Sequence, residues 1–141
     1  MSSVSLASRA TDWAAPLARI FFAAIFLMSG VSKLTNMAGA ATLMTAKGLP
    51  LVDLLLVLTI AIEIAAALAI AIGYRTRLAA LLLFLWMVPV TLVFHAFWAV
   101  EAAQFAIQRT QFLKNLAIMG GALMLVIHGA GAFSLDRRRG T

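Results

Sequence analysis

The chain has 141 residues, of which 64% are hydrophobic and only 11% are charged. A soluble domain of this size needs more polar side chains to cover its surface, so the composition excludes a soluble globular protein and indicates an integral membrane protein. The net charge of +6 would suggest nucleic-acid binding in a soluble protein. Here the basic residues stand at the ends of apolar segments, which is typical of membrane anchoring, and we expect no nucleic-acid partner.

Cysteine is absent from the sequence. A thiol–disulfide relay, a covalently attached haem, an iron–sulfur cluster and a thiolate-bound metal all require cysteine sulfur. This chain alone therefore houses none of them, and we expect no metal site.

Four apolar segments are each about long enough to cross a bilayer, because about 20 residues at a rise of 1.5 Å match a hydrocarbon core of roughly 30 Å. In chain order they span residues 13–32, 54–74, 78–100 and 116–135. No linker or charged tail of any length divides them. The sequence thus predicts a single all-α domain over residues 1–141, a four-helix transmembrane bundle with short interfacial helices, embedded in the lipid bilayer.

The connections between the spans differ in character. After Asn36, three apolar residues recur at helical spacing as far as Lys47 and Gly48, which predicts a short interfacial helix. Residues 101–114 place aromatic and glutamine side chains on one helical side, which predicts a second interfacial cover, whereas residues 73–77 form a basic turn. We expect any binding pocket to lie beneath the covers, on the outer side.

The basic residues also predict an orientation. Six of them fall on the side that holds both termini, against four on the other side, and an excess of Lys and Arg marks the cytoplasmic side. Both termini are therefore expected in the cytoplasm. The six are Arg9, Arg75, Arg77, Arg137, Arg138 and Arg139, and the four are Lys33, Lys47, Arg109 and Lys114.

Two charges lie deep within spans, Arg19 in the first and Glu63 in the second. A charge near mid-membrane costs on the order of 3 kcal/mol on insertion scales, so each needs a partner or a cavity. If Trp13 and Tyr74 mark the same membrane boundary, Arg19 lies about 9 Å and Glu63 about 16 Å below it. An extended arginine side chain can close this difference in depth. We predict a buried Arg19–Glu63 ion pair, and a proton-carrying or ligand-gripping Glu63 remains the alternative.

A second polar group is predicted near the outer ends of the spans. An imidazole, two ammonium groups, an amide and an aromatic wall suit a quinone headgroup or another polar-headed lipid-soluble molecule. An aromatic belt with snorkelling lysines explains several of the same residues. The predicted ligand-binding residues are Lys33, His95, Trp98, Lys114 and Asn115.

The two histidines do not suit a haem. His95 lies about 8 Å below the outer end of the third span, and His128 about 18 Å below that of the fourth. Ligation of one haem by two histidines needs nearly matched depths. We therefore expect no haem between them: an ordinary hydrogen-bonded side chain is the default for each histidine, and only His95 is also a candidate ligand-binding residue.

Several motifs, taken in order, resemble the DoxX family of small four-helix membrane proteins. They cover nearly the whole chain and are specific as an ordered set. They are Ser29-Gly30-Val31-Ser32-Lys33-Leu34, Lys47-Gly48-Leu49-Pro50, Gly73-Tyr74-Arg75-Thr76-Arg77, Phe94-His95-Ala96-Phe97-Trp98, Gln111-Phe112-Leu113-Lys114-Asn115-Leu116 with Gly120-Gly121, and the closing stretch from Gly129 to Asp136.

The resemblance implies a multi-pass protein of a bacterial cytoplasmic (inner) membrane. The family takes its names from members associated with quinol oxidase and thiosulfate:quinone oxidoreductase complexes, which implies a redox setting by association. The leading hypothesis is an accessory subunit of a quinone-linked or oxidative-stress redox system, with a redox enzyme as partner and a quinone as candidate cofactor. A small-solute or proton transporter or channel, and a structural assembly partner without its own activity, are the alternatives, and a homo-oligomer is compatible with each.

Overall fold

The computed structural model describes residues 3–140, and within that range every regular element is a helix. Four helices are long and apolar enough to cross a membrane, which confirms the all-α transmembrane prediction. A membrane protein of this kind contacts the lipid bilayer directly. The elements are α1 (Ser3–Thr35), α2 (Met37–Ala46), α3 (Val52–Ile72), α4 (Thr76–Phe94), the 3₁₀ helix η1 (Phe97–Ala99), α5 (Ala102–His128) and α6 (Leu135–Arg139).

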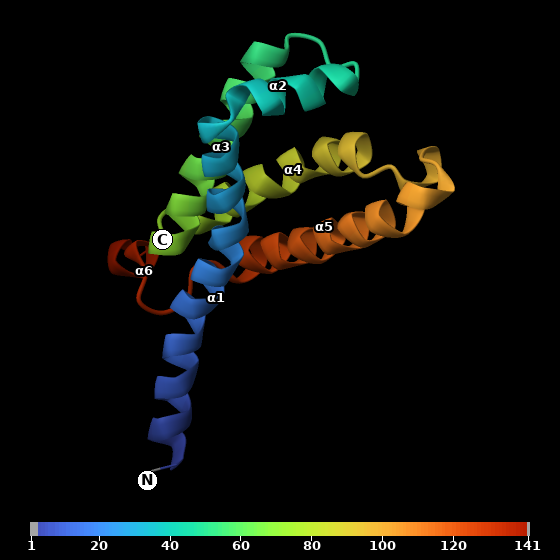
Figure 1. The fold of residues 1–141 in the computed structure, drawn as a ribbon. Coiled ribbons are helices and arrows are strands. Elements are labelled where there is room, and N and C mark those ends of the chain that lie inside the picture. Colours follow the sequence, from blue (N-terminus) through green and yellow to red (C-terminus); the bar gives the residue numbers. More distant parts are fainter. Residues whose placement is uncertain (1–2, 141) are drawn as a thin grey trace.

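The long helices form two pairs, with α1 packed on α3 and α4 packed on α5. Contacts between α3 and α4 join the pairs. Figure 1 shows the α4–α5 hairpin leaning away from α1 and α3, so the two pairs meet near the α3–α4 turn and separate toward the end that α2 covers. The bundle is therefore V-shaped, closed at one end and open at the other.

Small residues close the narrow end of the V. Ala66 and Ala67 of α3 and Ala79 and Ala80 of α4 are buried together in the main core. Alanine lets neighbouring helix backbones approach closely, which gives the packing that holds transmembrane helices together. Gly30 does the same between α1 and α3, because a Cβ at this position would lie 2.6 Å from the side chain of Ile64.

The short helix predicted after Asn36 is confirmed as α2. The Asn36 side chain caps it by accepting a hydrogen bond from the Gly39 backbone N–H at 3.1 Å. The helix ends at Lys47, followed by Gly48 with a φ of 70°. Met44 then packs α2 against α3 in a second, smaller core with Leu56 and Ile60.

The second predicted interfacial cover is wrong as a separate helix, because residues 102–114 form the first half of α5 and Glu101 is its N-cap. No proline interrupts this stretch, and the helix runs on into the apolar segment without a break. It ends at His128, before Gly129 and Gly131 with φ of 76° and 70°. The fourth span therefore begins and ends earlier than the predicted 116–135. The third span, Thr76–Ala99, agrees closely with the predicted 78–100, although α4 itself ends at Phe94 and η1 forms the last turn.

The C-terminal segment is tied back to the closed end of the V. The Asp136 carboxylate accepts hydrogen bonds from the backbone N–H groups of Arg75 at 2.6 Å and Thr76 at 2.9 Å, at the start of α4. Burial raises the pKa of Asp136, but the hydrogen bonds from Thr76 and Arg75, with the charge of Arg139, more than offset this and leave the pKa below its ordinary value. The first turn of α4 is thus capped by a carboxylate from the far end of the chain.

We expect Asp136→Ala to lower the free energy of unfolding at pH 7 by about 1 kcal/mol, as loss of a helix cap usually does. Because the folded-state pKa is depressed, the carboxylate stabilises the protein fully above the unfolded pKa of about 4, and this contribution is lost as pH falls through the folded value. Unfolding of both proteins in detergent at pH 7 and pH 3 measures this. Glu101→Ala is the control, because the Glu101 side chain makes no capping hydrogen bond at the start of α5. An equal loss of unfolding free energy in Asp136→Ala at the two pH values would contradict a stabilising role for the ionised carboxylate.

Candidate functional site

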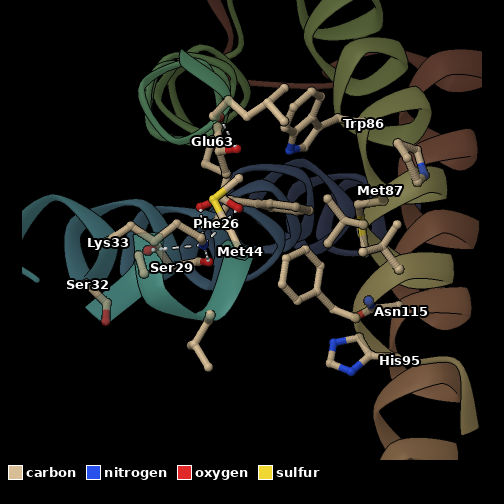
Figure 2. A pocket seen from close by; sticks show the side chains of 18 of the residues that line it. Phe26, Ser29, Ser32, Lys33, Met44, Glu63, Trp86, Met87, His95 and Asn115 are labelled. Carbon is tan, nitrogen blue, oxygen red and sulfur yellow. Dashed lines mark hydrogen bonds and ion pairs between the residues drawn. The ribbon is translucent and has the colours of Figure 1, made fainter. Parts of the chain in front are cut away.

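A cavity of about 660 Å³ lies in the open part of the V. Figure 2 shows Ser29, Lys33 and Glu63 on one side of it and Trp86, Met87, Asn115 and His95 on the opposite side. Most of its wall is apolar, and its polar lining comes from five of the helices and their ends. The polar and charged lining residues are Ser29, Ser32, Lys33, Asn36, Thr59, Glu63, Trp86, His95, Lys114 and Asn115.

Lys33 and Glu63 form an ion pair across the α1–α3 contact. The Lys33 ammonium donates to both oxygens of the Glu63 carboxylate, at 2.9 and 3.1 Å, and to the Ser29 hydroxyl at 2.5 Å. The Glu63 side chain is 8% exposed and that of Lys33 is 29% exposed. The pair therefore sits at the cavity wall, with the lysine end nearer its mouth.

The predicted Arg19–Glu63 pair is wrong, although both residues are buried as expected. Arg19 instead donates to the backbone carbonyls of Ala130, Ala132 and Phe133 in the loop after α5. Ala130 also lies beside Gly73, at the end of α3. Arg19 is thus level with the end of α3, and Glu63 lies ten residues, roughly 15 Å, farther along that helix.

The error came from aligning Trp13 with Tyr74 as markers of one membrane boundary. Arg19 is level with the end of α3, so Trp13, six residues earlier on α1, lies roughly 9 Å beyond the level of Tyr74. The cation that reaches Glu63 is Lys33, which occupies the same heptad row of α1 as Arg19, 14 residues on.

Two further polar groups of the cavity are held in place by neighbours. The His95 Nδ1 atom lies 2.9 Å from the Gln108 side-chain oxygen, and the Asn115 amide donates to the Thr91 hydroxyl at 3.0 Å. Because the Gln108 side-chain oxygen can only accept, Nδ1 of His95 is the donor in this contact. Both bonds join α5 to α4 or to its end, so they also orient the wall that faces Glu63.

Trp86 is a site residue that the sequence reasoning missed. Its indole Nε1 atom is buried, and the described part of the chain provides it with no hydrogen-bond partner. Trp86 lies ten residues, roughly 15 Å, inside α4, whereas tryptophan usually gathers at membrane interfaces. That unusual depth was the available signal. A buried N–H donor that faces a cavity is suited to a ligand that brings an acceptor.

Four of the five predicted ligand-binding residues line the cavity, namely Lys33, His95, Lys114 and Asn115. Their role in binding stays a prediction. Trp98 does not line it: this side chain is 58% exposed and packs edge-on against Phe97 and Phe112, with ring centroids 5.1 and 5.6 Å away. The early end of α4 turns Trp98 away from the cavity.

His128, the other histidine, is exposed in the last turn of α5 and is not among the cavity residues. Within the described residues no three His, Cys, Asp or Glu side chains come together as a metal site.

We expect Glu63→Leu to lower the free energy of unfolding by about 2 kcal/mol, because it leaves the Lys33 ammonium without its carboxylate in a largely apolar wall. Lys33→Met combined with Glu63→Leu should recover much of that loss, since replacing both members of a buried pair costs less than breaking it.

Denaturation in detergent of the two single variants and the double variant measures the coupling. Arg19→Met with Glu63→Leu is the matched control, and its effects should simply add, because these two residues are not in contact. Additive losses for the Lys33 and Glu63 variants would show that the pair does not stabilise the fold.

The DoxX family model matches residues 14–96. The inner membrane protein YphA of Escherichia coli (strain K12) is 32% identical over 122 residues, which cover 86% of this chain and 87% of YphA. The inner membrane protein YqjF of the same strain is 36% identical over 121 residues, which cover 86% of this chain and 88% of YqjF. No solved structure matches the chain.

Proposed function

The chain belongs to the DoxX family, and we propose that this member binds a quinone or another polar-headed, lipid-soluble molecule in the cavity between its two helix pairs. The observation that carries the proposal is the convergence of Lys33, Glu63, Trp86, His95 and Asn115 on one largely apolar cavity. The two relatives are named inner membrane proteins, which supports a place in a bacterial inner membrane, where such molecules dissolve.

The size and shape of the cavity suit such a ligand. Its volume of about 660 Å³ lies within the range of roughly 300–1,000 Å³ found for small-molecule sites. Several of its lining residues, among them Ile25, Leu43 and Pro89, are exposed on the outside of the bundle. In a membrane that exterior faces lipid, so a hydrophobic molecule can enter sideways between α1–α2 and α4.

The polar groups suit both redox forms of a quinone. The indole N–H of Trp86 and the ammonium group of Lys114 can donate to a carbonyl oxygen, and the Nε2 atom of His95 can accept from a quinol hydroxyl. Asn115 can do either. A ring between these groups would lie against Phe26 and Met87, both buried at the cavity wall.

In this proposal the chain is the accessory subunit that holds the ligand, and a quinone-linked membrane enzyme is the partner that carries out the redox chemistry. The absence of cysteine from the sequence supports a holding role, because the common protein-borne thiol couples need cysteine.

The amount of quinone bound to the purified protein tests the proposal. The protein is purified in native lipid particles, and the quinone extracted per mole of protein is quantified by mass spectrometry. Trp86→Phe or His95→Leu should each lower it about fivefold, the effect of losing a hydrogen bond worth about 1 kcal/mol. His128→Leu, which changes a histidine outside the cavity, should leave it unchanged.

Equal quinone content in all these variants, with normal folding, would contradict quinone binding in the cavity. Solute or proton flux through the purified protein in liposomes, abolished by Glu63→Leu, would instead support the transporter alternative.

We also propose that both termini face the cytoplasm. The closed end of the V carries five arginines, against four basic residues on the other side, and this excess supports the orientation. The five are Arg75, Arg77, Arg137, Arg138 and Arg139. The sequence count also included Arg9, whose side chain is not among those described. Since the chain has no cysteine, Arg138→Cys and Ala103→Cys provide single labelling sites at opposite ends.

In intact cells a membrane-impermeant thiol reagent should label Ala103→Cys and leave Arg138→Cys unlabelled until the membrane is opened. The reverse pattern would overturn the orientation.

A further inference from the structure

The closed end of the V carries a concentrated positive charge outside the cavity. We define the arginine patch as Arg75, Arg77, Arg137, Arg138 and Arg139, all of which are exposed. They belong to the α3–α4 turn, the start of α4 and α6, which Figure 1 places beside one another. Against these five cations the described part of the chain offers two nearby carboxylates, Asp12 and Asp136.

The arginine patch is held in a defined arrangement. Asp136 accepts from the backbone at the start of α4, and its own N–H donates to the Gly73 carbonyl at 2.8 Å. The guanidinium carbons of Arg75 and Arg139 lie 5.9 and 5.1 Å from the centre of the Tyr74 ring. These contacts join the turn to α6 and bring charges from two distant parts of the sequence together.

A hollow of about 420 Å³ lies beside the patch. Arg137 and Arg138 flank it, and Phe133 and Ser134 line it. Asp12 also lines the hollow, but its carboxylate oxygen is 4.0 Å from Arg137 and the two side chains are 48% and 69% exposed, so this ion pair is weak. The hollow can therefore accept an anionic group between two guanidinium groups.

An apolar track leads from the hollow toward the membrane interior. The Trp13 ring stacks on Phe133 with centroids 4.7 Å apart. Trp13, Leu17 and Phe21 follow one another at four-residue spacing on α1 and are 63%, 50% and 73% exposed. A phosphate in the hollow would thus have acyl chains lying along this face of α1, an arrangement that a free phosphate ion cannot use.

We propose that the hollow and the arginine patch form a binding site for one anionic phospholipid, with its phosphate between Arg137 and Arg138 and its acyl chains along Trp13, Leu17 and Phe21. The site is separate from the cavity and does not depend on the ligand proposed there. Each arginine near an anionic lipid contributes about 1 kcal/mol, so the loss of two should weaken binding about 25-fold.

The test is lipid binding to the detergent-solubilised chain, followed by native mass spectrometry. Phosphatidylglycerol is compared with phosphatidylcholine of the same acyl chains. We expect phosphatidylglycerol to bind more tightly, and Arg137→Gln with Arg138→Gln to remove that preference. Lys47→Gln with Arg109→Gln, which removes the same charge at the other end of the molecule, should retain it.

The Asp136→Ala variant distinguishes a specific lipid-binding site from nonspecific electrostatic attraction of anionic lipid. It makes the patch one charge more positive, so attraction by net charge alone predicts tighter phosphatidylglycerol binding. A site that depends on the docking of α6 predicts weaker binding. Tighter binding by this variant, equal binding of the two lipids, or an equal loss in the Lys47 and Arg109 control would each overturn the proposal.

Discussion

The fold depends on one constraint of the bilayer, that a charge in the hydrocarbon must find its partner within the protein. Two buried charges find such partners, one near the closed end of the V and one nearer its open end. Arg19 binds three carbonyl groups of the loop after α5 and so fixes the end of the chain against α1. The Lys33–Glu63 pair fixes the register of α1 on α3. Because both pairings would cost several kcal/mol to break, they leave α1 and α3 little freedom to slide.

The same constraint makes the cavity chemically unusual. Alanines of α3 and α4 pack together in the main core, and two larger members of that core, Phe26 and Met87, also line the cavity. The Trp86 N–H, which also lines this cavity, is buried without a partner among the described residues. In water such a donor would be solvated, but in a membrane it favours any entering molecule that carries an acceptor.

Sequence reasoning predicted the number and nature of the spans well, because hydropathy and length report directly on burial in lipid. It misplaced the start of α5 because its glutamines and Arg109 lower the hydropathy of a helix that continues without a break. It also chose the wrong partner for Glu63, since apolar length says nothing about the relative heights of two helices. Trp86 was missed because one tryptophan in an apolar run looks like core until the structure shows its N–H to be unpaired.

The DoxX family model covers only part of the cavity lining. Residues 14–96 match the DoxX model, and this range includes Lys33, Glu63, Trp86 and His95, whereas Asn115 and Lys114 lie beyond it on α5. The wall that α1 and α3 provide is held by the ion pair and by the close approach at Gly30. The α4–α5 hairpin provides the opposite wall, and α5 is the least buried of the four spans. The α1–α3 wall is thus fixed by an ion pair, whereas the opposite wall carries Trp86, His95 and Asn115, two of which are oriented by hydrogen bonds between α4 or its end and α5.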